Sequence, residues 1–373
     1  MTGHDGEGAR VGEALRVGIV GIGNISGQYL ATLPHHPGLR LTAVTDLDPD
    51  RAAEVARAHP GVRAVPPDEL YRADDVDLVL NLTVPSAHAE VALTAIAAGK
   101  HVYNEKPLAL TTEAGRAVLA AATAAGVRVG CAPDTVLGTG TQTARHHLDA
   151  GRIGTPVAAT AFMVSPGPER WHPSPDFFYR SGGGPLLDMG PYYLTALVTL
   201  LGPVRRVAGM AARPRATRTV GSGPRQGDEI PVEVDTHVTG TLEHAGGAIS
   251  TLLMSFDVWA AELPRIEVYG TDGSVSVPDP NGFGGPVRLF HRDSPEWTVM
   301  PESAGYAEAG RGCGLADLAA AVSDGGAHRA GGELALHVLD VMETLLRAAE
   351  RGRTEDIASR CERPEPVELS LPA

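Results

Sequence analysis

The sequence has few cysteines, few aromatic side chains and no long apolar run. Its three cysteines, Cys131, Cys313 and Cys361, are widely spaced and match no zinc or redox spacing. Few and scattered thiols suit a reducing compartment, so we expect a cytoplasmic protein whose cysteines are structural or inert. No apolar segment approaches the roughly 20 residues that cross a bilayer. No cluster of His, Asp or Glu has metal-ligand spacing, so no metal site is expected.

The chain also lacks basic character. Its 31 Lys and Arg residues stand against 45 Asp and Glu residues, which gives a formal net charge of −14. No run of Lys and Arg interleaves with aromatic residues. A surface of this charge repels nucleic acid and anionic membranes, so we expect neither as a partner.

The chain is long, and its hydrophobic pattern changes once along the sequence. Its 373 residues exceed the usual size of a single hydrophobic core, which predicts two domains. Residues 1–14 are small, polar and glycine-rich, and we expect a disordered tail there rather than a signal peptide. Residues 15–133 alternate short apolar strands with helices, which predicts an α/β, doubly wound parallel sheet with helices on both faces. Residues 134–373 carry longer alternating strands, which predict an α+β domain with a large, open, mostly antiparallel sheet.

Individual elements follow from the same periodicity. The pattern predicts later strands at 39–46, 77–85, 100–105, 127–133, 155–164, 231–244, 248–260 and 265–277. His-Ala-Gly-Gly, at 244–247, and Gly-Thr-Asp-Gly, at 270–273, should form hairpin turns among the last three of these segments. The helix at 48–59 should be capped by Asp48 or Asp50. The loops at 211–230 and 278–286 are rich in Gly and Pro and should have little to bury. The amphipathic helix at 333–352 is expected to close the structure or to pack back on the first domain.

A glycine motif follows the first strand, in GIVGIGNISG. Gly21 permits a tight turn, Gly23 lets backbone amides approach a diphosphate, and the helix that starts next adds a partial positive charge. The dinucleotide-binding fingerprint is G-x-G-x-x-G. At the position of its third glycine this chain has Ser26, which is small enough for close helix packing. We therefore expect Gly21, Gly23, Asn24 and Ile25 to bind a dinucleotide, although a glycine turn between strand and helix can be only structural.

An acid ends the second strand, roughly 20 residues further on, where it could accept hydrogen bonds from ribose hydroxyls. This residue is Asp46, and its alternative role is that of a turn or cap. Leu47 follows it and no arginine stands beside it, so NAD is favoured over NADP. Arg51 is near enough to keep NADP possible.

Three motifs in order, GIGNIS, TVPSAHAEVALTAIAAGKHVYNEKPLA and GGGPLLDMGPYY, resemble those of the glucose-fructose oxidoreductase / inositol dehydrogenase / MocA family. The resemblance runs from about residue 15 to the C-terminal helix. It implies an N-terminal Rossmann domain that binds NAD(P) and a C-terminal domain whose open sheet often serves as an oligomer interface. A homodimer or homotetramer is therefore expected.

The resemblance also implies roles for the E-K-P motif. Lys106 matches the lysine that lies near the nicotinamide and the substrate hydroxyl, and its neighbours Glu105 and Pro107 match as well. Pro107 fixes the chain at the strand end, and a cis bond is open to it. Lys106 alone could be an ordinary solvated lysine, but ligands bind at the carboxyl ends of parallel strands.

The loop after the third strand aligns with the loop that covers the nicotinamide side of the cofactor. Its matching residues are Thr83, Pro85 and His88. His88 could equally begin the next helix without any contact to the cofactor.

The third motif of the family is an acid followed four residues later by histidine or, in some members, tyrosine. Asp188 and Tyr192 fit it, in the tyrosine-bearing branch. Residues four apart share a helix face, so both can point into one cleft. Pro191 belongs in a first turn, which predicts a helix start near Asp188. The alternative is that Asp188 is an N-cap and Tyr192 a core phenol.

Oxidation of a secondary alcohol needs a group that takes the hydroxyl proton. A nearby ammonium can stabilise the phenolate of Tyr192, or Lys106 can itself carry the proton. We expect Lys106 and Tyr192 to form the acid/base and polarising pair, while Asp188 orients the lysine and the substrate hydroxyls. Which of the two moves the proton stays open.

Further substrate contacts are expected from two segments. Asp134 stands where relatives begin the second domain and often reach the substrate. Trp171, His172 and Arg180 precede the third motif, and an aromatic ring with polar neighbours suits the face of a sugar. A packed surface loop is the alternative for each.

The sequence therefore predicts an NAD(P)-dependent oxidoreductase that acts on a secondary alcohol or ketone of a sugar, cyclitol or related polyol. Two alternatives from the same family are a glycosidase that works through a transient keto-sugar and a non-catalytic, cofactor-sensing regulatory protein. The presence of Lys106, Asp188 and Tyr192 argues against a pure binding role.

Overall fold

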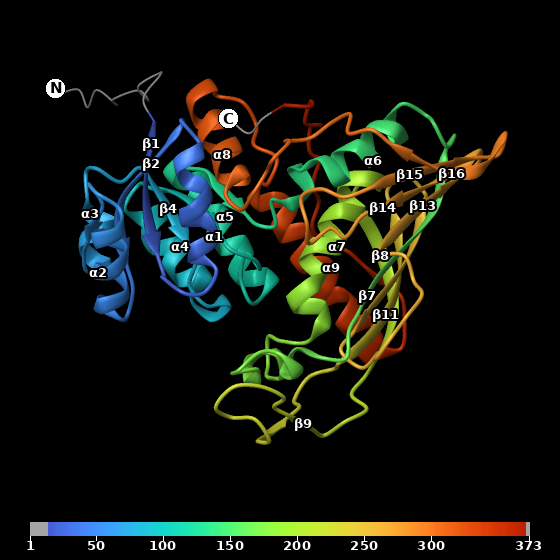
Figure 1. Ribbon diagram of the computed structural model, residues 1–373, viewed down its shortest axis with the longest axis horizontal. Coiled ribbons are helices and arrows are strands. Elements are labelled where there is room, and N and C mark those ends of the chain that lie inside the picture. The colour runs from blue at the N-terminus through green and yellow to red at the C-terminus, as the bar shows by residue number, and fades with distance from the viewer. Residues whose placement is uncertain (1–13, 371–373) are drawn as a thin grey trace.

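The structure, a computed structural model, describes residues 14–370. The tail expected at 1–14 therefore lies outside the described residues except for its last position. Two sheets, each with its own helices, lie side by side (Figure 1). The first is built from the start of the chain and the second from the remainder.

The first sheet is six-stranded and parallel, in the order β3-β2-β1-β4-β5-β6. Its strands are β1 (Leu15–Val20), β2 (Leu39–Thr45), β3 (Arg63–Ala64), β4 (Leu78–Asn81), β5 (His101–Asn104) and β6 (Val129–Cys131). Its helices are α1 (Ser26–Thr32), α2 (Pro49–Ala58), α3 (Pro67–Arg72), α4 (His88–Ala97) and α5 (Thr112–Ala125). This is the expected doubly wound Rossmann arrangement.

Both faces of this sheet are buried, as a parallel sheet requires. In β4, Leu78 and Leu80 pack into one apolar cluster and Val79 packs into another, all fully buried. Local signals set the helix ends. The Asp48 carboxylate accepts from the Asp50 amide at the start of α2, as one of the two predicted caps, and Gly126 ends α5 at a φ of 68°.

The second sheet has nine strands in the order β16-β15-β14-β13-β7-β12-β11-β8-β17. Only the β12/β7 pair is parallel, so the sheet is mostly antiparallel as expected. Its strands are β7 (Pro156–Val164), β8 (Val204–Ala212), β11 (His237–His244), β12 (Ile249–Ser255), β13 (Ile266–Gly270), β14 (Gly273–Val277), β15 (Val287–His291), β16 (Ser294–Met300) and β17 (Glu355–Asp356). The prediction missed β8, β15, β16 and β17, and it began β11 too early, because β11 starts only at His237.

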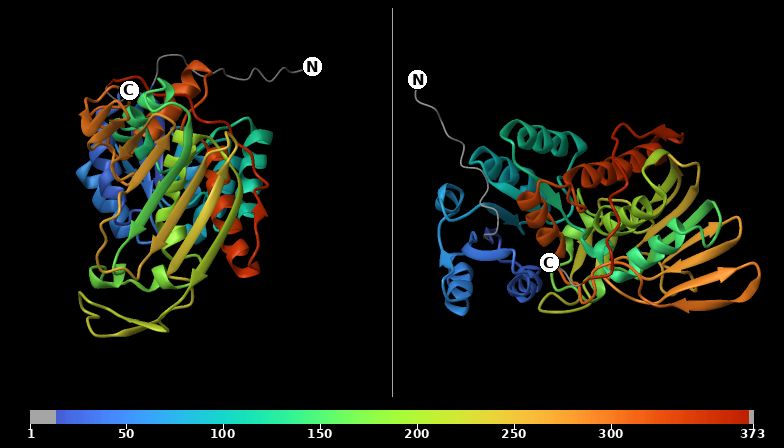
Figure 2. Two further views of the ribbon diagram at one scale, coloured as in Figure 1. Left: turned by 90° about the vertical axis from the view of Figure 1, so that its right-hand side faces the viewer. Right: turned by 90° about the horizontal axis from the view of Figure 1, so that it is seen from above.

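One face of the second sheet is covered and the other is open. Three helices pack on the covered face: α6 (Thr139–Asp149), α7 (Pro185–Leu201) and α9 (Gly332–Arg351). In Figure 2 the opposite face of the strands carries no helix. Burial alternates accordingly along β12, where Leu252 is fully buried and Ile249 is half exposed.

The loop at 211–230 is better packed than its composition predicted. It contains β9 (Thr217–Thr219), which pairs with β10 (Glu229–Pro231) in a small hairpin. Arg218 of β9 is 1% exposed and pairs with Glu169 at 3.1 Å and with Asp257 at 2.5 Å. The expectation of little to bury was wrong, because the hairpin buries the ion-paired arginine together with Val220 and Ile230.

The end of the chain returns to the first sheet. The Cys131 amide donates to the Ala330 carbonyl at 2.9 Å, and the Thr112 amide donates to the Glu343 carboxylate of α9 at 2.9 Å. α8 (Cys313–Asp324) packs against β6. The division of the chain at residues 133 and 134 stays a proposal. These contacts show that α8 and α9 also complete the first part.

Candidate active site

The glycine turn after β1 has the geometry of a ligand cradle. Gly21 has a φ of 97°, and a Cβ there would lie 2.9 Å from the Leu82 carbonyl group. A Cβ on Gly23 would meet nothing within 4 Å. Gly23 and Asn24 are exposed, and within residues 14–370 their amides donate to no protein group. Free amides ahead of α1 suit a diphosphate, so the residues present here fit a dinucleotide.

Asp46 lies beside this turn, at the end of β2. Its carboxylate accepts from the Ile22 amide at 2.6 Å and from the Asp48 amide at 2.8 Å. Each carboxylate oxygen has a second lone pair for a ribose hydroxyl. Leu47 is 98% exposed, and Arg51 pairs with Asp48 at 3.4 Å rather than reaching toward Asp46. This arrangement favours NAD.

The E-K-P segment follows β5. The Lys106–Pro107 bond is cis. Glu105 is buried, and its carboxylate accepts from the Tyr29 hydroxyl at 2.7 Å and from the Lys106 amide at 3.0 Å. Glu105 therefore ties the segment to α1, and its expected role in cofactor binding stays a prediction.

The loop after β4 is tied to the same segment. The Thr83 hydroxyl donates to Asn81 at 2.6 Å, and Pro85 begins a short 3-10 turn (Pro85–Ala87). His88 is buried, with Nδ1 2.6 Å from the Pro107 carbonyl oxygen and Nε2 3.0 Å from that of Thr83. Burial lowers the pKa of His88. His88 thus begins α4 and lies beneath the loop, which it holds against the E-K-P segment. It is a helix-start residue, as one alternative held, and it also supports the loop that the other alternative placed over the nicotinamide.

The motif with Asp188 opens α7, but not as predicted. The helix begins at Pro185, its N-cap is Gly184 with a φ of 91°, and Pro191 stands inside the helix. The predictions of a start near Asp188 and a first-turn Pro191 were therefore wrong. The alternative role of Asp188 as the N-cap is also wrong, because its amide donates to the Gly184 carbonyl at 3.0 Å within the first turn. The Asp188 carboxylate remains free for another partner.

That partner is Lys106. Its amine donates to the Asp188 carboxylate at 2.9 Å and to the Asp188 carbonyl oxygen at 2.8 Å, and both side chains are mostly buried. Burial acts to lower the pKa of Lys106, but the combined effects of Asp188, Tyr192 and Glu105 outweigh it and the net shift is upward. Lys106 is therefore held in its charged form.

Tyr192 completes the cluster from the next turn of α7. Its side chain is 6% exposed, and the Lys106 amine lies 5.3 Å from its ring centroid. Its phenol oxygen accepts from the Arg311 guanidinium at 3.0 Å. Burial raises the pKa of Tyr192, while the charges of Lys106 and Arg311 act to lower it. The structure thus brings Asp188 and Tyr192 together, as their spacing of four predicted, and places Lys106 beside both, as the resemblance implied.

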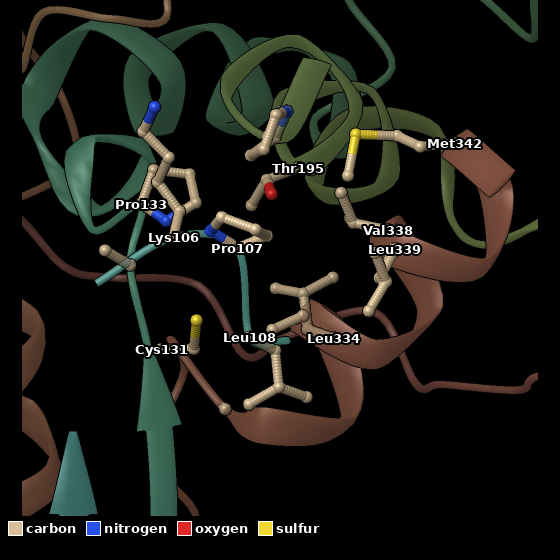
Figure 3. A pocket seen from close by; sticks show the side chains of 14 residues that line it. Lys106, Pro107, Leu108, Cys131, Pro133, Thr195, Leu334, Val338, Leu339 and Met342 are labelled. Atoms are coloured by element: carbon tan, nitrogen blue, oxygen red, sulfur yellow. The ribbon is translucent and has the colours of Figure 1, made fainter. Parts of the chain in front are cut away.

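A small apolar pocket lies on the other side of Lys106 (Figure 3). Leu334, Val338 and Met342 of α9 form one wall. In Figure 3 the amine of Lys106 points away from these side chains. The polar face of the lysine is therefore the one that carries Asp188 and Tyr192.

The expected substrate residues lie elsewhere. Asp134 is fully buried and its carboxylate accepts from the amides of Gly312 and Gly314, so it caps α8 and does not face a cleft. Trp171 is 66% exposed and packs edge-on against His172. Arg180 pairs with Asp176 at 3.8 Å. None of these residues contacts Lys106, Asp188 or Tyr192.

The sequence also missed a neighbour of the cluster. Arg311 stands in AGRGCG, a glycine-rich segment with no motif and no periodicity, more than a hundred residues from Tyr192. Only the fold shows that it reaches the phenol. Among residues 14–370 no group of three or more His, Cys, Asp or Glu could hold a metal ion. None of the helices described there has the length and apolar character of a membrane span.

Known families and structures agree with this geometry. A family model described as "Oxidoreductase family, NAD-binding Rossmann fold" matches residues 15–132, and one described as "GFO/IDH/MocA C-terminal domain" matches residues 141–276. The 1,5-anhydro-D-fructose reductase of Ensifer adhaerens is 29% identical over 266 residues, which cover 70% of this chain and 74% of that enzyme. Inositol 2-dehydrogenase 3 of Saccharopolyspora erythraea is 38% identical over 164 residues, which cover 42% of this chain and 48% of that enzyme.

A solved levoglucosan dehydrogenase, in complex with NADH and L-sorbose, has the same fold. Its TM-score is 0.77 at 19% identity, over 93% of this chain and 100% of that one. Fold and cofactor cradle together define an NAD-binding oxidoreductase of two-domain architecture. The chain belongs to the GFO/IDH/MocA oxidoreductase family.

Proposed function

We propose that this oxidoreductase interconverts a secondary alcohol and a ketone on a sugar, cyclitol or related polyol, with NAD as the preferred cofactor. The observation that carries the proposal is the cluster of Lys106, Asp188 and Tyr192 beside the carboxyl end of β5. Ligands bind at this edge of open parallel sheets, close to the glycine turn. The substrate class rests on the relatives, which include enzymes named for anhydrofructose and inositol.

The cofactor would lie along the first sheet. Gly21, Gly23, Asn24 and Ile25 would hold its diphosphate and Asp46 its adenosine ribose. When bound, the nicotinamide accepts or supplies the hydride. The loop with Thr83, which His88 holds in place, would border the nicotinamide.

In this arrangement Tyr192 is the group that exchanges a proton with the substrate oxygen. Two contacts to Asp188 use two of the three donors of the Lys106 amine, and the third can polarise a substrate oxygen. A lysine whose pKa is raised is a poor base, because its proton is held by the neighbouring carboxylate. The Tyr192 hydroxyl donates to no protein group within residues 14–370, so its proton is available to substrate.

We also propose that two or four copies associate through the open face of the second sheet. The pairing register places Leu253, Phe162 and Thr239 on one row of that face. Thr241 and Thr251 lie on the next row. A broad sheet face with uncharged residues at its centre would be covered by a second copy of the same face in a two-fold dimer. The three free cysteines suit the cytoplasmic location that we propose.

The test is a substrate panel with the purified protein. Sugars, inositols and glycosides are offered with NAD and, separately, with NADP, while nicotinamide absorbance and product sugars are followed. We expect reduced NAD to form with at least one polyol, and Lys106→Ala to abolish this signal while calorimetry still shows cofactor binding. Free sugar released from a glycoside without net reduced NAD would indicate a hydrolase instead. No turnover together with no cofactor binding would refute the proposal.

A further inference from the structure

Arg311 is a buried cation beside the phenol of Tyr192. It is 8% exposed, and its Nη2 donates to the Tyr192 oxygen at 3.0 Å and to Asn281 at 3.4 Å. Its Nη1 lies 3.6 Å from the Asp134 carboxylate. The Thr32 hydroxyl of α1 donates to the Arg311 carbonyl oxygen. Tyr192, Asn281 and Asp134 therefore fix the guanidinium, while Thr32 holds the backbone of Arg311.

This contact determines how the phenol can act. An arginine only donates hydrogen bonds, so the Tyr192 oxygen is the acceptor and its hydrogen must point elsewhere. Lys106 flanks the same ring at 5.3 Å, and the Arg311 guanidinium also lies 5.3 Å from the ring centroid. Two cations thus lie near the phenol, and its proton is directed away from Arg311.

We propose that Arg311 is a positioning residue for proton transfer, which aims the Tyr192 hydroxyl at the substrate oxygen and stabilises its phenolate. The inference rests on the proposed dehydrogenase or reductase function. In oxidation, the substrate hydroxyl proton forms a bond to the phenolate oxygen as its O–H bond breaks, and the carbon loses its hydride to the NAD nicotinamide as the carbonyl forms. Reduction reverses these steps, and Arg311 keeps its own protons throughout.

The electrostatics support this role. The charged groups that face the Tyr192 phenol are Lys106, Arg311, Glu105 and Asp188. Burial and the two carboxylates favour the neutral phenol, so the two cations are the groups that favour phenolate. Burial acts to lower the pKa of Arg311, but its anionic neighbours outweigh it and keep the guanidinium charged. The Asp134 carboxylate behind it has a pKa raised by burial, although the Arg311 charge acts to lower it.

The first experiment compares wild-type protein with Arg311→Gln. An adjacent guanidinium shifts the pKa of an acid by about 1–3 units, and the same size is expected for the phenol. We expect the limb on which log kcat for oxidation rises with pH, as the Tyr192 phenolate forms, to move to higher pH by at least about one unit. On that limb kcat then falls about tenfold or more at fixed pH, while KM changes little. An unmoved limb with unchanged kcat would overturn the proposal.

A second measurement does not depend on turnover. The near-ultraviolet phenolate titration of the protein without NAD or substrate, minus that of Tyr192→Phe, isolates the Tyr192 signal. Arg311→Gln should move this signal to higher pH or out of the accessible range, and the same midpoint in both proteins would contradict the inference. If Arg311→Gln shows this shift but the wild-type protein turns over no substrate, the proposed function is refuted while the inferred effect of Arg311 on the phenol stands.

Three further variants separate this role from a structural one. Arg311→Gln leaves the buried Asp134 carboxylate uncompensated, which by itself can destabilise the fold. The double variant Arg311→Gln/Asp134→Asn removes both charges. Its kcat should stay low if Arg311 acts on the Tyr192 phenol, and it should recover if the loss in Arg311→Gln came only from the destabilised fold. Arg311→Lys should recover part of the loss. Arg218→Gln removes another buried, ion-paired arginine and should lower stability without moving the pH limb.

Discussion

The glycine turn after β1 offers a sharp test, because its two glycines are needed for different reasons. At Gly21 the φ of 97° is unfavourable for any residue with a Cβ, at a cost of about 1–2 kcal/mol. A Cβ would also lie 2.9 Å from backbone atoms of Leu82 and Thr83, and such overlap costs about 1–3 kcal/mol. We therefore expect Gly21→Ala to lower the free energy of unfolding by about 2–5 kcal/mol, even without cofactor.

Gly23→Ala is the matched control. A Cβ at this position meets no atom within 4 Å, and the backbone φ is not in the left-handed region. The free energy of unfolding without NAD should change by less than about 0.5 kcal/mol. NAD affinity should nevertheless fall, because the added methyl group stands where the diphosphate approaches the backbone.

Denaturant unfolding without NAD and calorimetric titration with NAD check the pair together. The expected pattern is a destabilised Gly21→Ala protein and a stable Gly23→Ala protein that binds NAD weakly. Equal unfolding midpoints for Gly21→Ala and wild type would refute the steric reasoning at the turn. Undiminished NAD binding by Gly23→Ala would place the diphosphate elsewhere.

Four further outcomes are expected. Tyr192→Phe should abolish turnover but retain NAD binding in calorimetry, because only the hydroxyl is lost. Asp188→Asn should lower the pKa of Lys106 by removing its paired charge, seen as a loss of kcat that begins at high pH. Leu253→Arg should give a monomer in light scattering if the open sheet face is the interface, whereas the exposed control Leu47→Arg should not. Burial lowers the pKa of His337 from 6.5 to about 4, so the unfolded chain binds the extra proton first. Stability present above pH about 6.5 should fall by up to about 3 kcal/mol toward pH 4 in denaturant unfolding, and a flat profile would contradict this.

Local features of the fold could be predicted because they depend on neighbours in sequence. Asp48 caps α2 through an amide two residues away, and Asp188 and Tyr192 share a helix face at a spacing of four. The strand and helix alternation likewise gave the parallel sheet. The errors at α7 came from a local rule as well, since Pro191 is tolerated within the helix although it lacks an amide hydrogen.

Features that depend on distant parts of the chain could not be predicted. The hairpin of β9 and β10 looked like a solvated loop, because a buried arginine and its carboxylates have the same composition as a polar surface. Asp134 looked like a substrate ligand because its position matched the family pattern, yet the amides of Gly312 and Gly314 occupy its carboxylate. Sequence position alone does not tell whether a carboxylate faces a cleft or a helix end.

The candidate site combines these two kinds of information. Lys106 comes from the first sheet and pairs with Asp188 of α7, while Asp134 follows the first sheet and faces Arg311 from the segment before α8. Each cation is thus paired with a carboxylate from a different segment, and both cations lie near the Tyr192 ring. A sequence search for an acid four residues before a histidine or tyrosine finds Asp188 and Tyr192 on α7 but does not find Arg311. The second cation, which sets how readily the phenol gives up its proton, is defined only by the fold, which places the segment before α8 against Tyr192 of α7.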